Sequence, residues 1–152
     1  TLFSQRTLPA RLLVLGGGPI GLEMAQALAR LGSRVTVVEF LDRILGPEDA
    51  DVAAILRERL EAEGVAILTG TRAVRADSAG SGIRLSVAPA AGGATLVLEA
   101  DALLVATGRR PNVEKLGLEA AGVQFSPKGV PTDARLRTNI PHIYACGDHD
   151  RV

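Results

Sequence analysis

A glycine-rich segment near the start constrains the fold of this chain more than any other feature. Residues 12–23 read LLVLGGGPIGLE, an apolar run followed by a glycine turn and the start of an amphipathic pattern. Gly16, Gly18 and Gly21 have the G-x-G-x-x-G spacing. Such glycines permit a tight turn, close approach of a pyrophosphate, and close packing of a helix on a strand, with the helix N–H groups facing the phosphates. The spacing alone also fits a strand–helix turn that binds no ligand.

An acidic residue downstream favours the ligand-binding interpretation. Residues 33–39 predict a second strand ending in Glu39, which follows Gly16 by 23 positions. That is near the spacing of about 20 residues expected for an acid that binds the adenosine ribose. Its carboxylate can accept hydrogen bonds from both ribose hydroxyls and would repel a 2′-phosphate. A Glu at a strand end is ordinary by itself, but the whole unit predicts a dinucleotide site.

Composition bounds the classes of function. The chain has 152 residues, the size of one domain; 47% are hydrophobic and only 3% aromatic, so aliphatic side chains must build the core. Seventeen basic and 17 acidic residues give zero formal charge, which gives no support for binding nucleic acid or an anionic membrane. No apolar run reaches transmembrane length, and no signal peptide opens the sequence.

Cysteine and histidine are scarce. The single Cys146 excludes an internal disulfide or a C-x-x-C pair, and we expect it to be a small buried hydrophobe. With only His142 and His149 besides, no metal site is expected. A reducing, cytoplasmic setting fits this usage.

Periodicity predicts alternating strands and helices over the first 69 residues. We expect strands at 11–16, 33–39 and 65–69, with helices at 19–32 and 48–63 between them. This β-α-β-α-β order is the half-unit of a doubly wound parallel sheet. The helices would bury two apolar stripes: Ile20, Met24, Ala27, Leu28 and Leu31 in the first, and Val52, Ile55, Leu56 and Leu60 in the second.

The pattern changes after residue 70. Residues 71–77, 82–88 and 94–99 predict an antiparallel meander of three short strands. Residues 101–105 are apolar enough for a further strand of the parallel sheet, so the meander would be a crossover connection. The fold class is therefore α/β, a Rossmann-like parallel sheet with a three-stranded antiparallel meander crossover.

Two later segments carry weaker signals. Gly108 follows the strand that ends at residue 105, where open α/β sheets bind nucleotides, but it also fits an ordinary turn leading to Pro111. Residues 138–148 predict a short strand followed by Gly-Asp, and Asp148 could bind a sugar hydroxyl or cap a helix. Prolines break up the rest of residues 108–152.

Three segments in this order resemble the pyridine nucleotide-disulfide oxidoreductases: residues 16–23 with Glu39, residues 106–112 and residues 138–148. Within that family the chain is most similar to dihydrolipoamide dehydrogenases and mercuric reductase-like proteins, over about residues 7–148. The resemblance implies the NAD-binding domain of an FAD-dependent oxidoreductase, which orients the nicotinamide for hydride transfer with the flavin. It leaves open an NADH oxidase or ferredoxin reductase-type flavoprotein domain, or a non-catalytic NAD-sensing module.

The resemblance also assigns the cofactor-binding residues. The turn would hold the NAD pyrophosphate and Glu39 the adenine ribose; NADP-using relatives carry Arg at that position and six residues on, where this chain has Leu45, so we expect NAD. Glu23 would lie near the nicotinamide and flavin, although the helix dipole also favours an acid in a first turn. The full set, with Ala73 beside the adenine, Gly108 beside the nicotinamide ribose and Asp148 on FAD, is Gly16, Gly17, Gly18, Pro19, Ile20, Gly21, Glu23, Glu39, Ala73, Gly108 and Asp148.

The same resemblance predicts a fragment. Relatives begin with an FAD domain and a redox cysteine pair, and they end with a dimerisation domain that holds a catalytic His and Glu. We therefore expect residues 1–10 to be a lead-in linker, 11–108 an NAD-binding domain, and 109–152 a return segment toward the FAD domain of a homodimeric parent. No catalytic residue is expected here, and the isolated chain should bind NADH without turnover.

Overall fold

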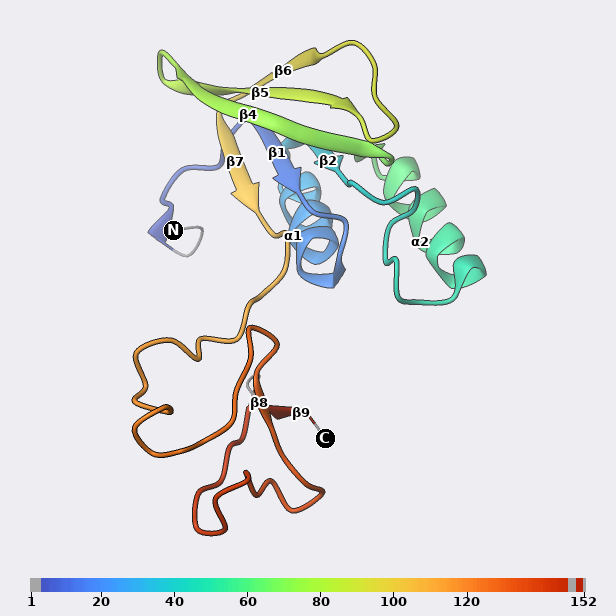
Figure 1. Ribbon diagram of the computed structural model, residues 1–152. Coiled ribbons are helices and arrows are strands. Elements are labelled where there is room, and N and C mark those ends of the chain that lie inside the picture. The colour runs from blue at the N-terminus through green and yellow to red at the C-terminus, as the bar shows by residue number, and fades with distance from the viewer. Residues whose placement is uncertain (1–3, 148–149, 152) are drawn as a thin grey trace. The chain divides into compact units, whose positions relative to one another are not determined.

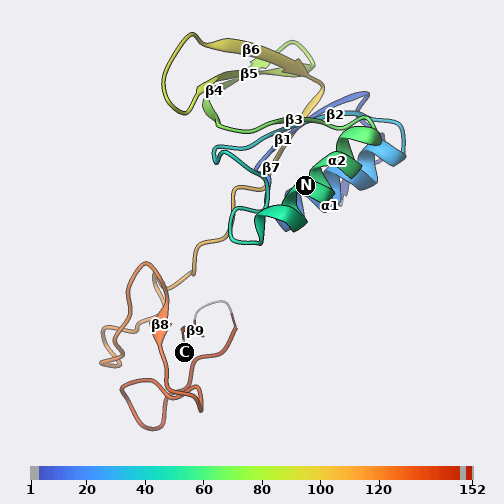
Figure 2. The same cartoon turned by 90° about the vertical axis from the view of Figure 1, so that its right-hand side faces the viewer.

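The computed structural model describes residues 4–147 and 150–151, which belong to two compact units, Thr1–Gly108 and Arg109–Val152. The first unit has three layers (Figures 1 and 2). A parallel sheet in the order β3-β2-β1-β7 forms the middle layer, with α1 and α2 on one face and the antiparallel sheet β4-β5-β6 on the other. The predicted fold class is confirmed.

Strand β1 (Arg11–Leu15) lies inside the parallel sheet, between β2 (Arg34–Val38) and β7 (Ala102–Val105), and β3 (Ala66–Leu68) follows β2 at the edge. Its residues after Arg11 are apolar without interruption because both faces of the sheet are covered. Alternate side chains enter different cores: Leu12 and Val14 join the cluster under the helices, and Leu13 joins the cluster under the antiparallel sheet.

The helices bury the predicted faces only in part: Leu60 is buried, and Leu28 and Leu56 pack against the core. Helix α1 (Pro19–Arg30) buries Gly21, Leu22 and Ala25, and α2 (Ala50–Ala62) buries Ala53 and Leu60. Small residues at the contact let each helix approach the sheet closely, so the buried face follows them rather than the bulkiest side chains. The stripes were therefore wrong at five exposed positions: Ile20, Ala27, Leu31, Val52 and Ile55.

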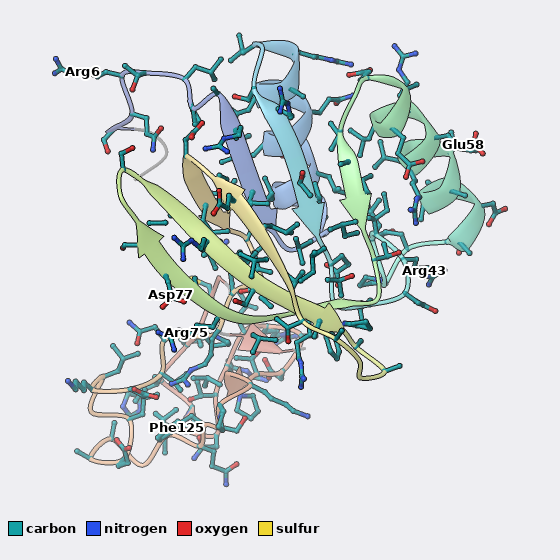
Figure 3. The ribbon with its side chains drawn as sticks, turned by 90° about the horizontal axis from the view of Figure 1, so that it is seen from above. Arg6, Arg43, Glu58, Arg75, Asp77 and Phe125 are labelled. Carbon is teal, nitrogen blue, oxygen red and sulfur yellow. The ribbon has the colours of Figure 1, made fainter. Side chains whose placement is uncertain are left out.

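The antiparallel sheet is the predicted meander. Strands β4 (Thr71–Ala79) and β5 (Gly82–Pro89) form a hairpin, and β6 (Leu96–Ala100) pairs with β5. The chain then enters β7 beside β1, so the meander is the crossover between β3 and β7. Arg75 and Asp77 on β4 form an exposed ion pair at 2.7 Å, and both are labelled in Figure 3.

The second unit has little regular structure. It contains β8 (Val130–Pro131) paired in parallel with β9 (Asp150–Arg151), and a small cluster around the buried Val113, Val123 and Val130. The strand predicted within residues 138–148 is wrong, because residues 138–147 offer only a single bridge, Arg137 with Tyr144.

Cys146 is exposed, which corrects the expectation that it is buried. Residues around it alternate, so Ile143 and Ala145 pack against the valine cluster while Tyr144 and Cys146 face outward. Neither α1 nor α2, the helices of the described residues, is long and apolar enough to cross a membrane.

Candidate functional site

The turn between β1 and α1 is closely surrounded by backbone on one side. Gly16 has a φ of +113°, and a Cβ there would collide with the Ala106 carbonyl that follows β7. A Cβ on Gly21 would collide with the carbonyl of Gly16, so this glycine brings α1 close to the strand. Gly18 differs, because nothing lies within 4 Å of a Cβ placed there. The turn is therefore packed from below and open on the side of Gly18.

The carboxylate of Glu39 is held against this turn. The backbone N–H of Gly17 donates to its Oε2 at 2.5 Å, and the N–H of Leu41 donates to its Oε1 at 2.7 Å. The main chain of Glu39 is also fixed, because its N–H donates to the Leu68 carbonyl and its carbonyl accepts from the N–H of Thr71, both at 2.8 Å. The fold thus places a half-buried acid at the carboxyl end of β2, beside the turn after β1.

Two hollows adjoin at this edge of the parallel sheet and share Gly16, Glu39 and Thr107 in their walls. The first, of about 280 Å³, follows the glycine turn and reaches Gly108. The second, of about 410 Å³, extends over the start of β4 at Ala73. Ligands of open α/β sheets bind outside the carboxyl ends of the strands, which is where both hollows lie. The arrangement suits an elongated ligand that carries negative charge at the turn and hydroxyls near Glu39.

Most of the predicted site residues come together here. The first hollow is lined by residues 16–20, Glu39 and Gly108, and the second by Glu39 and Ala73. Gly21 is buried beneath the turn. Asp148 lies outside the described residues.

Glu23 and Leu45 lie elsewhere. Both line a separate groove between α1 and α2, and neither lines the hollows at the sheet edge. Glu23 is the fifth residue of α1 and so lies beyond its first turn, which removes the helix-dipole explanation for an acid there. Leu45 has a φ of +48° and packs on the core beneath the helices, while its N–H donates to the Gly17 carbonyl at 2.9 Å.

Sequence reasoning missed several residues of the walls. Phe40 and Arg72 line the second hollow, Leu41 and Pro47 the first, and Thr107 both. The available signal was position, because each of Phe40 and Thr107 lies one or two places beyond a predicted strand end. The loop after β2 is closed by Arg43, which is labelled in Figure 3 and donates to the Gly46 carbonyl at 2.7 Å.

Two ion pairs of the first unit with shifted pKa values lie at the other end of the parallel strands. Hydrogen bonds from the Arg11 side chain and N–H, where β1 begins, lower the pKa of Asp101, just before β7. Where both helices end, Arg30 lowers the pKa of Glu63 to about 2. These pairs fasten elements together and lie away from the hollows. Among residues 4–147 and 150–151, no three His, Cys, Asp or Glu side chains are grouped to hold a metal ion.

Comparison with known proteins identifies the family. Residues 1–151 match the pyridine nucleotide-disulphide oxidoreductases, and the chain belongs to that family, as its three segments predicted. It is 46% identical over 146 residues to dihydrolipoyl dehydrogenase of Bacillus subtilis, covering 95% of this chain and 31% of that protein. The chain spans about a third of the length of the curated relatives it matches.

Solved structures agree. The HOCl-induced flavoprotein disulfide reductase RclA of Escherichia coli superimposes with a TM-score of 0.86 and 33% identity, over 97% of this chain and 33% of that one. An engineered water-forming NADPH oxidase with NADPH bound has a TM-score of 0.80 and 25% identity, over 93% of this chain and 30% of its own. The relatives are oxidoreductases and include flavoproteins, and the oxidase with NADPH bound is an engineered variant that carries five substitutions.

Proposed function

We propose that residues 11–108 form an NAD(H)-binding domain of an FAD-dependent oxidoreductase similar to dihydrolipoamide dehydrogenase. The observation that carries this proposal is the Glu39 carboxylate, fixed beside an open glycine turn and between two adjoining hollows. The turn would bind the pyrophosphate through helix N–H groups, with Gly18 leaving room for close approach. Ala73 would lie beside the adenine, and Gly108 beside the nicotinamide ribose.

Glu39 supports NAD rather than NADP. A carboxylate has about four lone-pair positions, and the two N–H donors occupy one on each oxygen. One position on each oxygen remains for the 2′- and 3′-hydroxyls of the adenosine ribose, whereas a 2′-phosphate would be repelled. Leu45 supports this choice less directly than its sequence position implied, because its side chain packs on the core.

The role of FAD rests on the family. The chemistry that a bound flavin supplies is hydride exchange with the nicotinamide, while the residues of this chain bind and orient the nucleotide. Glu23 would lie near the nicotinamide and flavin, and Asp148 would contact FAD. We propose no catalytic acid, base or nucleophile in this chain, and we expect NADH binding without turnover.

The remaining parts of the proposal concern the larger protein. Residues 109–152 would return toward an FAD domain, in a homodimeric and cytoplasmic parent. The alternative is an NADH oxidase- or ferredoxin reductase-type flavoprotein, because an oxidase and a ferredoxin reductase are among the solved structures that this chain resembles. The two share this nucleotide domain, so the acceptor depends on parts of the protein beyond it.

Calorimetric titration of the chain with NADH and NADPH tests the proposal. We expect NADH to bind at least about tenfold more tightly than NADPH, and Glu39→Ala to weaken NADH binding about tenfold to a hundredfold, because hydrogen bonds to a charged group are lost. Asp42→Ala is the matched control, since it removes an equal charge from an exposed residue three positions on that lines neither hollow. Tighter binding of NADPH than of NADH would contradict the proposal, as would a Glu39→Ala variant that binds NADH as tightly as the unsubstituted chain.

A further inference from the structure

We infer that Gly17 is a positioning residue that sets how Glu39 recognises the adenosine ribose. Gly17 lies between Gly16 and Gly18, at the first position that the G-x-G-x-x-G spacing leaves unspecified. The inference rests on the ribose-binding role proposed above for Glu39. It is carried by hydrogen bonds and by a close contact between Gly17 and the Glu39 side chain.

The peptide groups of Gly17 connect the turn to the loop after β2. Its N–H donates to Oε2 of Glu39 at 2.5 Å, and its carbonyl accepts from the N–H of Leu45 at 2.9 Å. The N–H of Leu41 holds the other carboxylate oxygen at 2.7 Å. Two backbone donors from different segments therefore fix both the position and the plane of the carboxylate. A carboxylate fixed in this way can meet two vicinal hydroxyls without first being ordered, which lowers the cost of binding.

The space at Gly17 is limited by the Glu39 side chain. A Cβ at this position would lie 3.1 Å from Cβ, Cγ and Oε2 of Glu39, which is closer than ordinary van der Waals contact. The Glu39 side chain would have to shift by a few tenths of an ångström. The backbone of Gly17 is outside the left-handed region that disfavours side chains, so an alanine there acts through Glu39 rather than through backbone strain.

A side chain would meet different surroundings at each of the three neighbouring glycines, Gly16, Gly17 and Gly18. Gly16 needs its positive φ and its contact with Ala106, whereas Gly18 faces open space. Of the three, only Gly17 contacts the Glu39 side chain through the position that a Cβ would take. Gly18→Ala is therefore a matched control, because it adds the same methyl group one residue away without touching Glu39.

The test compares NADH with its 2′-deoxyadenosine analogue, which lacks the 2′-hydroxyl that would donate a hydrogen bond to Glu39. For the unsubstituted chain we expect NADH to bind about tenfold more tightly than the analogue. In Gly17→Ala this ratio should fall to about twofold or less, because the displaced carboxylate meets the hydroxyl with poorer geometry and loses its fixed orientation. In Gly18→Ala both ligands should bind more weakly by a similar factor, so the ratio stays. Far-UV circular dichroism of each variant confirms that the helices are retained.

A double-variant cycle separates the inference from the proposed function. Gly17→Ala should weaken NADH binding about fivefold or more in the parent chain and less than about twofold in a Glu39→Ala background, since contacting residues that act together are non-additive. Equal effects in both backgrounds, or an unchanged ratio in Gly17→Ala, would overturn the inference and leave NAD binding standing. No binding of NADH by the parent chain would instead refute the proposed function.

Discussion

The two units of this chain are stabilised in different ways. In residues 1–108, strands far apart in the sequence pair with one another, and two buried clusters join the sheets and helices. In residues 109–152, the described strands have two residues each and the buried cluster centres on three valines. A site that needs a carboxylate and backbone N–H groups at fixed positions is built on the first kind of framework, because long-range pairing fixes loop ends.

Local hydrogen bonds take the place of long strands in the second unit. Asp133 accepts from the N–H groups of Arg135 and Arg137 at 2.8 and 3.0 Å, both within four residues. Asn139 makes a longer link, since its Oδ1 accepts from the Gln124 N–H and its Nδ2 donates to the Gly122 carbonyl, each at 2.8 Å. We therefore expect core substitutions to lower the free energy of unfolding most in the first unit, and substitutions at turns to lower it most in the second.

The largest effect is expected from Leu60→Ala in α2. Leu60 is 1% exposed, and removing a buried Leu side chain should lower the free energy of unfolding of residues 1–108 by about 2–5 kcal/mol. Ile55→Ala in the same helix is the matched control, because Ile55 is 68% exposed and its loss should cost about 0.5 kcal/mol or less.

Two probes read the units separately during urea unfolding. Tyr144 is the only tyrosine and there is no tryptophan, so intrinsic fluorescence follows residues 109–152. Far-UV circular dichroism follows the helices, which in the described residues both lie in the first unit. Leu60→Ala should shift the dichroism transition alone; a matching shift in Tyr144 fluorescence would show that the two units unfold together.

A smaller effect is expected from Asn139→Ala in the second unit. The substitution removes two exposed hydrogen bonds that join its segment to residues 122–124, at a cost of about 1–2 kcal/mol. Tyr144 fluorescence should report the loss, and amide hydrogen exchange at Gln124 should accelerate while that of β1 stays unchanged. Gln124→Ala is the matched control, because it truncates an exposed amide side chain and keeps the backbone N–H that donates to Asn139. Equal losses in the two variants would contradict the role given to the Asn139 side chain.

The contrast between the units also explains how much could be predicted from the sequence. Strands β1, β2 and β7 were predicted to within two residues because a strand covered on both faces is mostly apolar, as these three are apart from Arg11, Arg34 and Thr36. The strand expected within residues 138–148 failed because pairing needs a partner, and residues 138–147 form a single bridge, at Tyr144. An apolar segment by itself does not reveal whether a partner strand is available.

The buried faces of the helices and the hydrogen bonds of the site could not be predicted from the sequence, because they depend on distances between elements. Bulky residues such as Ile55 gave the expected stripe, but Ala53 makes the contact that the packing distance requires. The spacing of Gly16 and Glu39 predicted a common site, and the structure brings both to the same hollows. The spacing could not predict that the Gly17 N–H donates to the Glu39 carboxylate, because that hydrogen bond depends on the path of two loops in space.

The smallest effect is expected at Glu63, which links the ends of both helices. Its carboxylate accepts hydrogen bonds from Arg30 at 2.7 and 2.8 Å, from Arg59 at 2.8 Å and from Gln26 at 3.2 Å. The hydrogen bond from Arg30 is the main reason that its pKa falls from 4.5 to about 2. Because the folded-state pKa lies below the unfolded value, the ionised carboxylate stabilises the fold above about pH 4.5, and this contribution is lost as the pH falls toward 2.

Glu63→Gln keeps the shape of the side chain and removes its charge. The variant should unfold more easily than the parent chain near neutral pH, and its stability should depend less on pH between about 4.5 and 2. Added salt should reduce the difference, since the arginine partners are largely exposed. Glu99→Gln, which removes a looser ion pair with Arg84 at 3.4 Å, is the control. If dichroism-monitored unfolding of both variants had the same pH profile, Glu63 would be an ordinary surface acid, and the link between α1 and α2 would rest on apolar contacts alone.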